Sequence, residues 1–425
     1  MADQPNNLTL AKILPNYNLR TERPLYKNKI SGGSSFISDV AYGDMVYNTF
    51  KRLTIAPNGN QPSGAIQNQP IQFKIDPNQI KGKIANLTLE VGLAETGGTS
   101  SVTPIALTAF FEKATISANG NPNNILQTID GSLFYTSFNF YSPATAAELC
   151  AFNQCNMVST SFAGETAIAA GTTVYYEVHI PIECLRQIDT NTIKGALLVT
   201  IYPWASGVAS GSGTLAWAAQ AMMLKVSYTT DVVADGRTAR DIMKSVYRAP
   251  FLDTRLFTQT LTLTAGSRSS IPLNGVDGLC AALCVMIRAS KSTTSSGYRT
   301  FTALGGTNEQ VDAYIDIVNS SAQSIIGEQV SGRFWRSTHQ AQHVPSLFSS
   351  VVPVYWLYFT PTIMDALSSD GRFDGLVDFG SNVHTLILNP SAVSSAFTTG
   401  TYTVDVLFLT YANLEISNGE VKRIV

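Results

Sequence analysis

The chain repeats three short strand-like segments in the same order and at nearly the same spacing. The matching pairs are residues 80–91 with 276–287, 174–181 with 354–361, and 224–229 with 407–412. Each segment is rich in the apolar, β-branched and aromatic residues that β-strands favour. Because order and spacing agree, the pattern predicts two tandem copies of one all-β domain.

The length of the chain agrees with two copies. Its 425 residues provide for about two to three domains of ~100–200 residues each. Short alternating runs such as residues 71–75 and 84–93 are separated by turn sequences such as 119–122. No helical period is long enough to indicate an α/β fold. The expected fold is therefore two β-sandwiches, each large enough to bury its own core.

Breaks in the strand pattern divide the chain into four parts. The predicted division is an N-terminal arm (1–49), a first β domain (50–235), a linker with a short helix (236–255) and a second β domain (256–425). Polar segments at 182–191 and 362–369 predict a short helix at the same place in each copy. Long stretches at 95–172 and 290–350 are expected to be irregular surface insertions.

Charge and hydropathy exclude several classes of function. Charged residues make up 14% of the chain and the formal net charge is −2, whereas soluble domains average roughly 25% charged residues. Such a surface is typical of permanent subunit contacts, or of mesophilic extracellular β-proteins. It provides no basic field for nucleic acid, so sequence-specific nucleic-acid binding is not expected. The apolar runs are too short to span a bilayer, and no signal peptide is visible.

Five cysteines are an odd set for a disulfide framework. Cys280 and Cys284 lie four residues apart in a strand-like run, so alternation predicts that both lie on one face as small buried hydrophobes. These features indicate synthesis in a reducing compartment such as a cytoplasm.

Searches for catalytic and ligand-binding patterns give no enzyme signature, and no cofactor is predicted. The sequence contains neither a phosphate-binding loop nor a nucleophile elbow. His339 and His343 have metal-ligand spacing, but Gln340 replaces the glutamate of the zinc-protease motif. Residues 370–375 lack the oxygen ligands of a calcium loop. The aromatic run at 355–359 is interpreted as core and subunit contact rather than a stacking surface for bases or sugars.

The first 35 residues are more basic than the rest. The basic side chains are Lys12, Arg20, Arg23, Lys27 and Lys29. This arm is either a solvated tail or a segment that orders against a neighbouring subunit, an anionic membrane or nucleic acid.

Four collinear segments carry a resemblance to a known family. They are residues 73–87, 106–134, 175–181 and 379–390. They resemble strands of the double jelly-roll major capsid proteins, the tectivirus and adenovirus-hexon lineage, in particular those of tailless icosahedral phages. The resemblance implies two tandem eight-stranded jelly-roll β-sandwiches, with short helices between late strands and long loop insertions.

The same resemblance implies a function and partners. The chain would be a major capsid protein, a homotrimer whose six jelly rolls form a pseudo-hexagonal block that tiles an icosahedral shell. Its partners would be its own copies and minor capsid, penton and vertex proteins in the virion. The insertions would form outward towers and trimer contacts. The basic arm would point inward, towards an internal membrane where one is present.

Two alternatives remain open at this point. A tandem jelly-roll carbohydrate-binding protein needs exposed aromatics and carboxylates grouped in loops. The four tryptophans lie mostly in or beside strand patterns: Trp204, Trp217, Trp335 and Trp356. A two-domain hydrolase acting on glycans needs a pair of acids at one site, and no convincing pair stands out.

Overall fold

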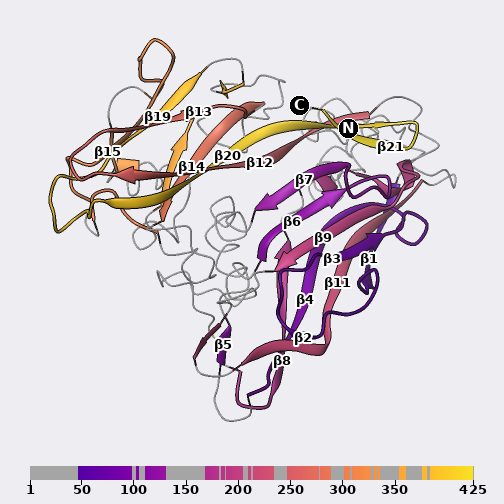
Figure 1. Ribbon diagram of the computed structural model, residues 1–425. Helices are drawn as coiled ribbons and strands as arrows, with labels where there is room; N and C mark the ends of the chain where they lie inside the picture. Colours follow the sequence, from indigo (N-terminus) through magenta and orange to yellow (C-terminus); the bar gives the residue numbers. More distant parts are fainter. Residues whose placement is uncertain are drawn as a thin grey trace, which may run out of the picture.

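The computed structural model describes most of the chain after residue 45. The described residues are 46–97, 102–104, 111–130, 168–180, 183–186, 188–203, 209–211, 214–233, 247–276, 278–288, 301–306, 309–326, 330–332, 334–335, 354–359, 376–380 and 383–424. These residues form mainly antiparallel β-sheets, arranged as two sandwiches (Figure 1).

The first sandwich packs two four-stranded sheets on each other. One sheet has the order β1 (Val46–Ile55), β11 (Leu215–Val233), β4 (Lys83–Glu95), β8 (Thr173–Ile180). The other has the order β3 (Ile71–Ile75), β9 (Leu197–Pro203), β6 (Phe111–Ser117), β7 (Ile125–Asp130). A short strand, β2 (Gly64–Ala65), also pairs with β11, while β5 (Val102–Pro104) pairs with β10 (Ala209–Gly211).

The second sandwich has the same plan. One sheet has the order β12 (Tyr247–Leu263), β20 (Gly400–Ser417), β14 (Leu279–Arg288), β17 (Val354–Tyr358). The other has the order β13 (Ser269–Leu273), β19 (His384–Asn389), β15 (Tyr314–Val318), β16 (Val330–Ser331). The short strands β18 (Val377–Asp378) and β21 (Glu420–Ile424) pair with β14 and β20.

Strand order identifies both sandwiches as jelly rolls. When the eight strands of the paired four-stranded sheets are counted along the chain, each sandwich joins its first, eighth, third and sixth strands in one sheet. Its second, seventh, fourth and fifth strands form the other. The two sandwiches are therefore topologically identical, with the eight strands of a jelly roll. The predicted fold is confirmed, and the three repeated segments fall on the third, sixth and eighth strands of each copy.

The prediction that 95–172 and 290–350 are irregular was wrong in part, because both stretches contain strands of the sandwiches. Residues 95–172 contain β6 and β7, and residues 290–350 contain β15 and β16, which are the fourth and fifth strands of each sandwich. The turn between β6 and β7 uses Asn119 and Gly120, whose φ values are 60° and 68°. Strands this short show too few alternations to stand out from a loop.

The structure describes one of the short helices expected from the sequence. Between β8 and β9 lie α6 (Glu183–Arg186) and the 3-10 helix η5 (Thr190–Thr192), which confirms the short helix of the first copy. The expected helix at 362–369 lies outside the described residues, as do residues 234–246 of the linker. β12 already begins at Tyr247, within the range expected for the linker. The four-part division of the chain stays a prediction.

The two cysteines of β14 do not share a face, contrary to the prediction. Cys280 packs in the core of the second sandwich, whereas Cys284 belongs to the other large hydrophobic cluster. The pairing of β14 with β20 shifts register between Cys280 and Ala282. An extra residue at such a β-bulge turns the following side chains to the opposite face. Both thiols are free and buried, as expected of small hydrophobes.

The ends of β12 and β20, together with β21, extend from the second sandwich onto the first (Figure 1). The Asn119 side chain donates to the Val421 carbonyl at 3.0 Å and accepts from its amide at 3.1 Å. Thr254 Oγ1 donates to the carbonyl oxygen of Thr128 at 3.1 Å, at the edge strand β7. These hydrogen bonds connect the two sandwiches.

We expect the Asn119→Gly substitution to weaken this joint. Glycine tolerates the positive φ of this turn, so the main loss is the two hydrogen bonds to Val421, about 1–3 kcal/mol of unfolding free energy. Asn418→Gly is the matched control, because Asn418 also has a positive φ, 54°. Urea denaturation measures both; equal midpoints for the two variants would contradict the role of Asn119.

A buried acid on β12, near its pairing with β20, should make the free energy of unfolding depend on pH. Asp253 is 2% exposed, and its Oδ2 lies 2.7 Å from Nη2 of Arg423 and 3.6 Å from Nε of Arg255. Loss of hydration on burial raises the pKa of Asp253 to about 6, against the opposing attraction of Arg255. The folded state therefore binds more protons than the unfolded state, whose Asp pKa is about 3.9.

Because of this difference, the free energy of unfolding should fall as pH rises from about 4 to about 6, by an amount on the order of 2 kcal/mol from this group. Thermal unfolding of the native chain and of Asp253→Asn between these pH values checks the sign. We expect the native chain to gain stability on acidification relative to the variant. Parallel pH curves for the two proteins would contradict the shifted pKa.

Candidate assembly surface

The outer face of the sheet β1-β11-β4-β8 is the most exposed sheet surface of the first sandwich for which side chains are described. Alternate residues of each strand point inward, and Leu89 and Val178 among them are fully buried. The residues between them point outward. Phe50 on β1 and Tyr175 on β8 are 57% and 51% exposed, which is high for large apolar side chains.

A three-residue ion cluster crosses this face. Glu90 on β4 and Glu177 on β8 are direct cross-strand partners, and like charges in that position destabilise a sheet. Lys225 on β11 compensates both: its Nζ contacts Glu177, and lies 2.6 Å from the Glu90 carboxylate. Hydrogen bonds from Lys225 to Glu177 and to Glu90 raise the pKa of Lys225, which keeps its ammonium group charged at neutral pH. The Arg52 guanidinium carbon lies 5.8 Å from the centre of the Phe50 ring.

The equivalent face of the second sandwich is buried within the same chain. The row formed by Leu407, Cys284 and Trp356 crosses its eighth, third and sixth strands, and each of these side chains is fully buried. The Trp356 and Tyr358 rings stack with their centres 5.8 Å apart. These residues belong to the same contiguous cluster as the core of the first sandwich. The fold thus covers one copy of this face and leaves the other accessible.

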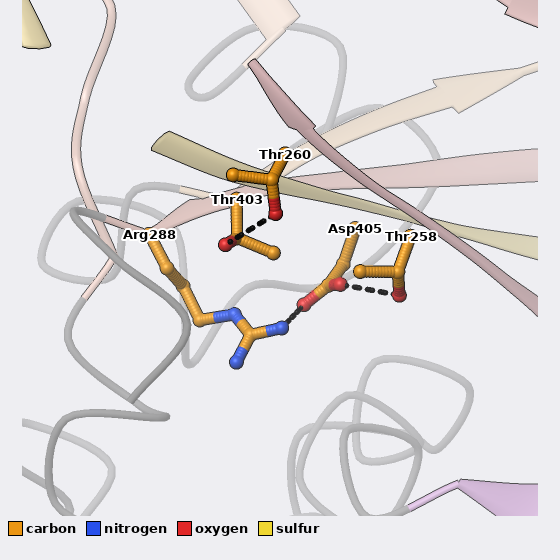
Figure 2. A network of polar contacts seen from close by, with 5 residues as sticks. All are labelled: Thr258, Thr260, Arg288, Thr403 and Asp405. Atoms are coloured by element: carbon orange, nitrogen blue, oxygen red, sulfur yellow. Dashed lines mark hydrogen bonds and ion pairs between the residues drawn. The ribbon is translucent and has the colours of Figure 1, made fainter. Parts of the chain in front are cut away.

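A polar network lies at the edge of the buried face (Figure 2). Arg288 at the end of β14 forms an ion pair with Asp405 of β20, and the two side chains are 2% and 4% exposed. Thr258 of β12 donates to Asp405 at 2.7 Å, and the Thr260 and Thr403 hydroxyl oxygens are 3.3 Å apart. Charges this deeply buried require a partner. The network therefore connects β12, β20 and β14 rather than forming a reactive site.

The basic arm predicted from sequence lies outside the described residues: Lys12, Arg20, Arg23, Lys27 and Lys29. His339, His343 and residues 370–375 also lie outside them. Within the described part of the chain, no group of three potential ligands could hold a metal ion. In the same residues, no helix has the length and apolar character needed to cross a bilayer.

Sequence reasoning missed the ion cluster on the exposed face. A signal was available, because Glu90, Glu177 and Lys225 each stand between two core residues of a strand. A charge in that position must point away from the core. Which strands bring the three charges together depends on the sheet order, and the repeat pattern alone does not provide it.

Comparisons with known proteins point to one fold. No protein-family model matches the chain, and no curated protein matches it by sequence. The PBCV-1 virus capsid model has a TM-score of 0.61 at 13% identity, covering 89% of this chain and 97% of that one. PBCV-1 VP54, fitted into a reconstruction of the virophage Sputnik, has a TM-score of 0.63 at 12% identity, with the same coverage. The Faustovirus major capsid protein has a TM-score of 0.57 at 11% identity, covering 88% and 91%.

At such identities the likeness concerns the fold. It extends over most of both chains and agrees with the strand order found in each sandwich. The chain has the double jelly-roll fold of viral major capsid proteins.

Proposed function

We propose that this chain is a major capsid protein, with a structural and non-enzymatic role in the virion. Three copies would form a block of six jelly rolls with a pseudo-hexagonal outline, and such blocks would tile an icosahedral shell. Two observations support the proposal: the identical strand order of the two sandwiches, and a fold similarity that covers 97% of the PBCV-1 capsid chain and 91% of the Faustovirus major capsid protein.

The unequal burial of the two sandwiches supports a ring of copies. Within one chain, the outer face of the second sandwich is buried, while that of the first presents Phe50 and Tyr175. A contact between unlike surfaces that repeats from copy to copy closes into a ring when the rotation permits. Three chains carrying two sandwiches each would close such a ring, with the second sandwich of one copy covering the first sandwich of the next.

The chemistry of the exposed face suits a contact between subunits. Aromatic side chains and arginine are enriched in the centres of protein interfaces, and Phe50, Tyr175 and Arg52 provide them. The cluster of Lys225 with Glu90 and Glu177 is internally neutralised to a single negative charge, so a neighbour could cover it at a smaller electrostatic cost.

The proposed shell also assigns an outer or inner position to the remaining parts of the chain. We place those parts of 95–172 and 290–350 that lie outside the sheet strands β6, β7, β15 and β16 on the outer surface, where they would form towers and trimer contacts. The arm with its five basic residues would face inward, towards the head groups of an internal membrane or other anionic contents. Minor capsid, penton and vertex proteins would complete the shell.

The native mass of the chain tests the trimer. We expect light scattering to give three times 45.7 kDa, with hexagonal particles in negative stain. The double substitution Phe50→Asp and Tyr175→Asp should give a folded monomer, because buried carboxylates without partners oppose association. Val383→Asp is the matched control, since Val383 is 56% exposed and lies beside β19 of the second sandwich.

The trimer and the position of its contact surface are overturned by different results. A stable monomer of the native chain would overturn the trimer and remove the main support for the shell. A native trimer that persists in the Phe50 and Tyr175 variant, with circular dichroism unchanged, would overturn only the placement of the contact.

The arm has its own test. Replacing Lys12, Arg20, Arg23, Lys27 and Lys29 by glutamine should abolish co-sedimentation with phosphatidylserine vesicles while the native mass stays the same. Each basic residue near an anionic surface contributes about 1 kcal/mol. Phosphatidylcholine vesicles are the control. Unchanged sedimentation of the variant, or normal particles after deletion of residues 1–30, would contradict an inward-facing arm that binds anionic material.

A further inference from the structure

The loop between β1 and β3 forms a solvent-open cavity of about 260 Å³ against the start of β11. Its lining is rich in side-chain amides, those of Asn58, Asn60, Gln61, Gln67, Gln69 and Gln72. All residues that line the cavity are among those the structure describes, and none of them is charged. Trp217 of β11 and Ile71 of β3 supply apolar wall.

The loop is held in place from two sides. The pairing of β11 with β4 is interrupted between Trp217 and Met222. Next to this irregularity, the Gln61 amide donates to the Met222 carbonyl at 3.0 Å and accepts from the Met222 amide at 3.1 Å. On the other side of the irregularity, β2 pairs with β11 at Ala216 and Trp217. The cavity therefore exists before any ligand arrives, which lowers the entropy cost of binding.

The backbone of the loop is also restrained. Pro57, Pro62 and Pro70 line the cavity, and proline fixes its own φ angle. Gly59 and Gly64 take φ values of 118° and 71°, which favour glycine. The prolines thus restrict the backbone of the loop, and the glycine turns direct its side chains towards the cavity.

Four of the lining amides form two hydrogen-bonded pairs. Asn58 Nδ2 donates to Gln72 Oε1 at 3.2 Å, and Gln69 Nε2 donates to Gln67 Oε1 at 2.9 Å. Each pair still has amide hydrogens and carbonyl lone pairs to offer. The Asn60 side chain also lines the cavity and is exposed to solvent. A hydroxyl group, which donates and accepts at once, matches such a lining.

We propose that this cavity binds a neutral saccharide. A charged ligand would lose hydration there without an opposite charge in the lining. A wholly apolar ligand would leave the amides without water. A sugar offers hydroxyls to the amides, and its C–H face can pack on the exposed edge of Trp217, which is 7% exposed. The amide- and proline-rich run at 57–72 is the sequence signal for this site.

The position of the cavity relates it to the exterior of a shell. β2 lies at the opposite end of the first sandwich from β21 (Figure 1). β4 ends at Glu95 and β8 begins at Thr173, so the stretch between them starts and finishes at the same end as the cavity. That end faces outward in the proposed shell, where the saccharide would belong to a host-surface glycan. This orientation rests on the proposed function, whereas binding in the cavity does not.

A glycan array probed with the full chain tests the site, with neutral and sialylated oligosaccharides side by side. We expect binding to neutral glycans. The double substitution Asn60→Ala and Gln69→Ala should raise the Kd about tenfold, as the loss of one to two hydrogen bonds predicts. Asn78→Ala, at an exposed turn after β3, is the matched control and should bind as the native chain does.

Three results would overturn the assignment: no binding to any neutral glycan, binding restricted to sialylated glycans, or equal binding by the Asn60 and Gln69 variant. Light scattering and circular dichroism of each variant confirm that its mass and fold are unchanged. A variant that loses glycan binding but keeps the native mass therefore reports on the saccharide site and not on assembly. If the native chain is a monomer that binds neutral glycans, the capsid proposal is overturned and the saccharide site still stands.

Discussion

Burial of both faces of the sheet β12-β20-β14-β17 is the constraint on which the rest of the structure depends. An antiparallel sheet commonly leaves one face to water, yet Trp356 and Leu407 on the outer face are as buried as Tyr355 and Phe408 on the inner one. The outer face shares a hydrophobic cluster with the core of the first sandwich. The second sandwich therefore owes much of its burial to contacts beyond its own two sheets, and the two halves of the chain form one cooperative unit.

This double burial explains what the sequence predicted and what it did not. The repeats located the third, sixth and eighth strands because these strands are rich in apolar residues in both copies. The gapless match nevertheless paired Val178, which points into the first core, with Tyr358, which points out of the second sandwich. Every residue of β17 is buried, so alternation no longer marks its faces and the register is weakly specified. The bulge at Ala281 misled the same reasoning for Cys280 and Cys284.

The functional surfaces were harder to predict than the strands, for a physical reason. A charge between two core residues, such as Glu90, predicts an outward side chain, but its partners depend on which strands are neighbours. The amide-rich loop is visible in the sequence, yet its cavity depends on the irregularity in β11 that frees the Met222 backbone for Gln61. In both cases the decisive contacts join segments that are 48 or more residues apart, and local patterns contain no information at that range.

The contact between Asn119 and Val421 has a consequence for biosynthesis. The two residues are 302 positions apart, and contacts between such distant segments form late because a long loop must first close. On the ribosome, the first sandwich can begin to fold well before β21 emerges. Its turn at Asn119 then waits for the last strand of the second sandwich. Chains interrupted before β21 would keep the contact between Thr254 and Thr128 but lack the hydrogen bonds to Val421. These hydrogen bonds form only after translation has passed the final strand.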